Sequence, residues 1–177
     1  MDSSGRDWTN GPPARNYYPR GNPAAETRSP KLHAFMRERI GTAIATVSSM
    51  PDIKSYRDLI AWQKALDLAD LVYELTEQFP PRERFGLAHQ MRKSAVSVPS
   101  NIAEGHRRRT PGYLHHLEIA LGSHGELDTQ SILAFRRGFI VGDHAVRLEA
   151  LIAEVGMITH GLFRSVESSA GSPRPNP

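Results

Sequence analysis

The chain contains no cysteine, which excludes disulfide bridges, thiolate zinc sites and thiol nucleophiles among its 177 residues. No apolar run approaches the roughly 18 residues needed to span a bilayer. The N-terminus also lacks the basic-then-apolar order of a signal peptide. We therefore expect a protein without membrane spans that resides in the cytoplasm.

Motifs of the common catalytic and metal-binding sites are missing as well. The chain has no Glu-x-x-His pair of the kind that di-iron bundles use, and no His-x-x-x-His pair. It also lacks the Gly-x-Ser-x-Gly nucleophile motif and a phosphate-binding Gly-Lys-Ser/Thr loop. We predict no catalytic residues, no metal site and no cofactor, and hence a protein that is not an enzyme.

Formal charge is distributed unevenly along the chain. The net charge of +3 at pH 7 comes entirely from residues 1–49, which hold seven basic and four acidic side chains. The remainder holds fifteen of each sign, so its total charge does not indicate an acidic partner. A basic face on the remainder must come from local clustering.

The composition changes near Met50. Residues 1 to about 30 are rich in glycine and proline, and we predict that residues 1–49 are disordered. One interpretation is that Met50 is the native start and that residues 1–49 are an upstream extension. Residues 50–166 carry the apolar periodicity of a folded domain, whereas residues 167–177 have the composition of a disordered tail.

Apolar residues recur at helical spacing in four segments, and no segment has a strand pattern. The predicted helices span about Tyr56–Gln78, Arg82–Arg107, Thr110–Arg137 and His144–Val166. Ser55 and Asp58 have the spacing of a capping box, and Thr110 and Asp143 are predicted N-caps. Because the connections are short, we predict an all-α, antiparallel up-down-up-down four-helix bundle.

The second predicted helix contains Pro99, which removes a helical hydrogen bond and leaves the Ala95 carbonyl without its amide partner. Ser97, Ser100 and Asn101 lie nearby and offer replacement donors. We predict one kinked helix rather than two helices.

Polar residues at helical spacing predict a polar seam between the second and third helices. The seam comprises Ser97, Asn101 and Glu104 on the second helix and Ser123, Glu126 and Gln130 on the third. Gly122 and Gly125 flank the third-helix residues and predict a close approach of the backbones. A hydrogen-bonded seam would fix one register of the helices. The alternative is a functional pocket around Asn101, Glu104 and Glu126.

Arginines at the end of the second predicted helix are the best candidates for contact with nucleic acid. Arg107, Arg108 and Arg109 are consecutive, whereas Arg92 and Lys93 lie about four turns earlier. A cyclic oligomer would repeat the three consecutive arginines around one rim, where they could engage phosphates. The alternative is that they complement the helix dipole and keep the turn solvated.

Specific motifs in the chain are Leu59 with Trp62-Gln63-Lys64-Ala65, Ser97 to Gly105, and Gly122-Ser123 with Glu126-Leu127. From about Ser55 to Arg164, the chain resembles the small four-helix-bundle proteins first noticed as open reading frames within ribosomal RNA intervening sequences. That family is similar to the accessory protein of diversity-generating retroelements. The resemblance implies a ring-like homopentamer of antiparallel bundles with no established enzymatic activity. For the accessory-protein relatives it implies nucleic-acid binding and docking to a reverse transcriptase.

Two functional hypotheses remain open. The first is a homo-oligomeric accessory module, with a pentamer as the expected assembly, that binds RNA or DNA through an arginine-lined rim. The second is an oligomeric protein–protein scaffold without nucleic-acid contact. The salt dependence of binding to structured RNA and duplex DNA distinguishes them.

Overall fold

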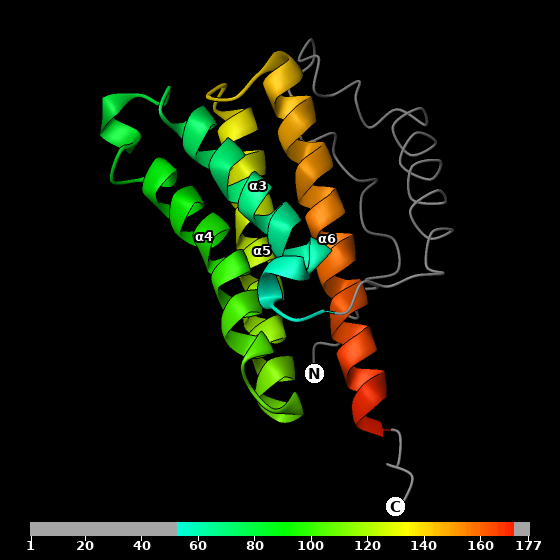
Figure 1. Ribbon diagram of the computed structural model, residues 1–177. Coiled ribbons are helices and arrows are strands. Elements are labelled where there is room, and N and C mark those ends of the chain that lie inside the picture. Colours follow the sequence, from blue (N-terminus) through cyan, green and yellow to red (C-terminus); the bar gives the residue numbers. More distant parts are fainter. Residues whose placement is uncertain (1–52, 172–177) are drawn as a thin grey trace, which may run out of the picture.

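A computed structural model describes residues 53–171, which form four α-helices and two one-turn 3₁₀ helices (Figure 1). In chain order the elements are η2 (Tyr56–Asp58), α3 (Ile60–Thr76), η3 (Pro81–Glu83), α4 (Leu87–His106), α5 (Thr110–Arg136) and α6 (Gly142–Gly171). This part of the chain contains no strand, in agreement with the sequence pattern. The disorder predicted for residues 1–49 concerns residues outside the described range, as does most of the predicted tail.

The first predicted helix is divided at Leu59. Asp58 Oδ2 accepts a hydrogen bond from the Ser55 amide at 2.8 Å, and Ser55 Oγ accepts one from the Arg57 amide at 3.3 Å. These bonds form the predicted capping box, which stabilises η2 rather than the long helix. Leu59 then has an extended backbone, with ψ 120°, and α3 begins at Ile60.

The second predicted helix also begins later than expected. Pro80 and Pro81 open the short η3 helix. Gly86 has a non-helical ψ of −122°, and α4 begins after it, at Leu87. Glu83 Oε2 accepts a hydrogen bond from the Leu87 amide at 3.1 Å, which satisfies one of the free amides at the start of α4.

The N-caps predicted for the last two helices are wrong. Arg109 occupies the N-cap position of α5, so Thr110 lies inside the helix and no side chain caps this end. Gly142 begins α6 with a φ of 59°, a value that favours glycine. Asp143 lies inside the first turn of α6, where its negative charge complements the helix dipole. The helix continues to Gly171, beyond the predicted end near residue 166.

The four helices pack side by side, and their direction alternates along the chain, as the sequence of colours in Figure 1 shows. Each helix contacts two neighbours in the cycle α3–α4–α5–α6, and the α4–α5 contact is the most extensive. The shared core includes one fully buried large side chain from each helix: Leu68, Met91, Leu127 and Leu148. None of these four helices is both long and apolar enough to cross a membrane.

The close approach of α4 and α5 depends on Gly105. A Cβ atom at this position would lie 2.8 Å from His116 Cβ and 2.8 Å from Tyr113 Cδ2, which is too close for either side chain to remain in place. The role predicted for Gly122 and Gly125 is wrong, because a Cβ atom at either would meet no other atom within 4 Å. The glycine that permits close contact therefore lies on α4 rather than on α5.

α4 is continuous through Pro99, whose ring is buried. Two of the predicted side-chain donors reach backbone carbonyls near the proline, although not that of Ala95. Ser100 Oγ donates to the Val96 carbonyl at 2.8 Å, and Asn101 Nδ2 donates to the Ser97 carbonyl at 2.9 Å. Both acceptor carbonyls precede the proline, and they lie one and two residues after the predicted position at Ala95.

The two ends of the bundle are named here for later use. The turn end consists of η2 and residues 107–109, which connect α4 to α5. The loop end, at the opposite end in Figure 1, consists of residues 77–86 and residues 137–141. The rings of Phe79 and Phe139 lie 5.2 Å apart and bring the starts of the two loops together.

Candidate nucleic-acid interface

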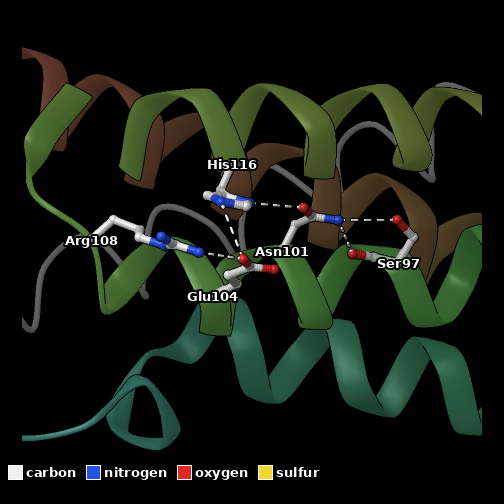
Figure 2. A network of polar contacts seen from close by, with 5 residues as sticks. All are labelled: Ser97, Asn101, Glu104, Arg108 and His116. Atoms are coloured by element: carbon white, nitrogen blue, oxygen red, sulfur yellow. Dashed lines mark hydrogen bonds and ion pairs between the residues drawn. The ribbon is translucent and has the colours of Figure 1, made fainter. Parts of the chain in front are cut away.

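The polar seam lies between α4 and α5 and leads toward the turn end (Figure 2). Ser97 Oγ and Ser123 Oγ are 2.8 Å apart, a hydrogen bond that joins the two helices. Asn101 Nδ2 donates to Ser97 Oγ at 3.1 Å in addition to the Ser97 carbonyl. Because these bonds orient the Asn101 amide group, its Oδ1 accepts a hydrogen bond from His116 Nδ1 at 3.1 Å.

Glu104 lies where the seam meets the turn end. Its Oε1 accepts a hydrogen bond from Arg108 Nη2 at 2.8 Å and lies 3.6 Å from His116 Nε2 (Figure 2). The hydrogen bond from Arg108, followed by the charge of His116, lowers the pKa of the Glu104 carboxyl. Since His116 Nδ1 donates to Asn101, only the protonated ring can also donate from Nε2 to Glu104. Arg108, in the turn, is thus paired with an acid from the last turn of α4.

The remaining seam residues form a separate group. Ser94 is buried and donates to Glu126 Oε2 at 3.1 Å, which makes another hydrogen bond between α4 and α5. Gln130 is half-buried, and its Oε1 has no hydrogen-bond partner among the described residues. The structure thus places Glu126 outside the network of Asn101 and Glu104, rather than in a common pocket with them.

Two residues of these networks were missed by the sequence analysis. Ser94 lies three residues before Ser97, and His116 lies seven residues before Ser123, so helical spacing places each on the same face as a predicted seam residue of its own helix. The spacing signal was therefore present in both cases. For His116 the spacing signal was obscured by the adjacent His115, which is exposed. Only the register of α5 against α4 shows which of the two histidines faces the seam.

The three arginines of the turn end have different surroundings. Arg107 Cζ lies 5.5 Å from the centroid of the Tyr56 ring, which is also approached by Arg57 at 5.1 Å. Arg108 is paired with Glu104, whereas Arg109 is exposed and has no acidic partner within residues 53–171. All three side chains are exposed, so the turn end presents them to solvent despite these contacts.

Arg92 and Lys93 do not join this group. Arg92 Nε donates to Thr76 Oγ1 at 2.7 Å, and its guanidinium lies 4.9 Å from the centroid of the Tyr73 ring. Arg92 is thus held against α3, whereas Lys93 is exposed. Lys93 precedes residue 107 by about 21 Å of helix, so one copy of the chain does not unite the five predicted basic residues in one patch.

The helical span that carries the seam and the turn end matches a known family model. The model, described as 23S rRNA-intervening sequence protein, matches residues 57–161, more than half of the chain. The chain belongs to the 23S rRNA-intervening sequence protein family. This membership confirms the family that the sequence motifs indicated.

The match to the 23S rRNA-intervening sequence family begins within η2 and ends within α6. It therefore includes the whole polar seam and the three arginines of the turn end. No curated protein matches the chain. The similarity to the accessory protein of diversity-generating retroelements stays a prediction.

Proposed function

We propose that the protein is a non-enzymatic, homo-oligomeric helix-bundle module that binds RNA through phosphate contacts at the turn end. The observation that carries this proposal is the exposure of three consecutive arginines between α4 and α5 in a chain of an rRNA-associated family. Arginine presents a planar fork of donors that suits phosphate oxygens. Consecutive residues in a turn point in several directions, so we expect about two of the three to reach one RNA strand.

Exposed apolar side chains on α3 support self-association. Ile60, Leu66 and Tyr73 lie on this helix and remain exposed. A homo-oligomer, with the pentamer as the expected form, would repeat the turn end around a ring and convert weak phosphate contacts into strong overall binding. The large aromatic residues Trp62 and Phe139 do not contribute to this exposed surface, because both pack against the core.

One contact favours the scaffold alternative. The pairing of Arg108 with Glu104 lowers the positive charge that the turn end offers to a phosphate. A surface ion pair contributes little stability, so a phosphate can displace the carboxylate at small cost. If the turn end binds RNA, the Arg108–Glu104 ion pair must open and therefore weakens binding. In a scaffold without RNA contact, the ion pair would stay closed.

A salt titration of RNA binding by matched variants tests the proposal. The full chain is compared with Arg107→Ala/Arg108→Ala and with the control Arg147→Ala/Arg164→Ala, which removes equal charge from α6. The turn-end variant should bind structured RNA more weakly and reduce the slope of log K against log salt by as much as about 1.8. Glu104→Gln should strengthen binding because it releases Arg108.

Residues 1–49 are common to all these variants, so their positive charge does not contribute to the differences. Equal affinities and equal salt slopes for the turn-end variant and its control would exclude the turn end as an RNA contact. Binding that is absent even at about 50 mM salt would favour the scaffold.

A further inference from the structure

Phe85, at the loop end, is the most exposed large apolar residue among the described residues. It precedes α4 by two residues, and 85% of its surface is exposed. Phe79, at the start of the same loop, is 7% exposed and packs against Phe139. The loop therefore contains one phenylalanine that anchors it to the core and one that faces solvent.

Two arginines precede this exposed ring in the chain, and two more lie at the same end of the bundle. Arg84 Cζ lies 5.8 Å from the centroid of the Phe85 ring, and Arg82 is exposed nearby in η3. Arg136 and Arg137 are exposed at the end of α5, which terminates at the loop end (Figure 1). None of the four arginines pairs with an acid within residues 53–171, in contrast to Arg108.

The acids at the loop end form no ion pair with these four arginines within the described residues. Glu83 accepts a hydrogen bond from the Leu87 amide and so serves the start of α4. Asp143 lies in the first turn of α6, and Glu77 is the C-cap of α3. The loop end thus combines an exposed aromatic ring with guanidinium groups that are available to an anion.

We propose that the loop end binds an unpaired nucleotide of RNA, with its base stacked on Phe85 and its flanking phosphates bound by Arg82 and Arg84. An exposed aromatic ring beside positive charge is the combination that binds single-stranded nucleic acid, because every base offers a face for stacking. A base inside a duplex is already stacked on both sides and does not offer that face. The proposal rests on RNA being the ligand but not on the turn-end arginines.

A second copy of the chain is the competing occupant. Its α3 helix has an acidic outer side, on which Asp67 and Asp70 are exposed, and the exposed C-cap residue Glu77 follows them. The three acids would complement the arginines, but Tyr73, the exposed aromatic ring of α3, already has the Arg92 guanidinium 4.9 Å from its centroid and so offers Phe85 a poorer stacking partner than a base does. A polyanion with planar bases complements both features of the loop end, so RNA is the occupant that we infer.

Binding of two fluorescent RNAs by the full chain tests this inference. The probes are a short unstructured oligoadenosine and a duplex RNA of the same length. Phe85→Ala should weaken binding of the single strand by about 5- to 150-fold, the equivalent of losing one stacked base, and should leave duplex binding unchanged. Phe85→Trp should retain single-strand binding, and the control Met157→Ala, an exposed apolar residue on α6, should have no such effect.

Light scattering on the same samples separates the two occupants. An unchanged mass for Phe85→Ala together with selective loss of single-strand binding supports the inference. A lower mass for Phe85→Ala would assign the ring to contact between copies and overturn the inference. Unchanged binding of the single strand, or equal weakening of single-strand and duplex binding, would also overturn it. Arg107→Ala/Arg108→Ala reports separately on the turn end, so failure of either site is distinguishable from failure of the other.

Discussion

The two ends of the bundle both carry exposed arginines, but their neighbours differ. At the turn end, Arg108 is paired with Glu104 and Arg107 lies against the Tyr56 ring. At the loop end, the arginines have no acidic partner within residues 53–171, and Phe85 is exposed beside them. A run of arginines in a sequence therefore does not measure the charge available to a ligand, because a residue one helical turn away can neutralise it.

The close packing at the turn end predicts the largest effect. Gly105→Ala should destabilise the protein by as much as about 3 kcal/mol, because the new methyl group would overlap His116 Cβ and the Tyr113 ring. Gly122→Ala should stabilise it by roughly 0.5–1 kcal/mol, since that position has open space and alanine favours helix. Urea unfolding of both variants measures the two changes. Equal effects of the two substitutions would contradict the close approach at Gly105.

The fold could be predicted from the sequence more completely than the surroundings of the candidate sites. Helical spacing and short connections were sufficient for a four-helix bundle, since both are local properties of the chain. The break at Leu59 was missed because its extended backbone depends on burial of its side chain against the other helices. The surroundings of His116 and Arg107 depend on contacts between separate segments, for which spacing within one helix contains no information.

The network beside the turn end predicts an intermediate effect. Asn101→Leu removes the acceptor of His116 Nδ1 and the donor to Ser97, and should lower the free energy of unfolding by about 1–2 kcal/mol. Ser100→Ala is the matched control, because it removes an exposed side-chain hydrogen bond from the same helix and should change stability by less than about 0.5 kcal/mol. Thermal unfolding distinguishes the two. A fully stable Asn101→Leu variant would instead make Asn101 a residue kept for ligand binding.

Substitution of Tyr113 should have the smallest effect, and it should raise rather than lower the free energy of unfolding. Its hydroxyl is buried without a hydrogen-bond partner among the described residues, and burial raises its pKa to about 12. Tyr113→Phe should therefore stabilise the protein by about 1 kcal/mol. Tyr73→Phe, on the exposed side of α3, is the control.

The raised pKa of Tyr113 also makes the stability of the protein depend on pH in the alkaline range. The unfolded chain releases the tyrosine proton near pH 10, about two pH units before the folded protein does. Ionisation of Tyr113 therefore does not change the free energy of unfolding below about pH 10 but lowers it as pH rises toward about 12. Tyr113→Phe should lack that part of the alkaline loss. An identical alkaline profile in urea unfolding would show that the hydroxyl is solvated.

Ultraviolet crosslinking of bound RNA, followed by mass spectrometry of the crosslinked peptides, tests most directly the claim that the ends of the bundle bind RNA. The full chain should give crosslinks to peptides that contain Phe85 and to peptides from the α4–α5 turn. Phe85→Ala should remove only the first group, and Arg107→Ala/Arg108→Ala should weaken only the second. Crosslinks confined to residues 1–49, or to the sides of the helices, would contradict the account.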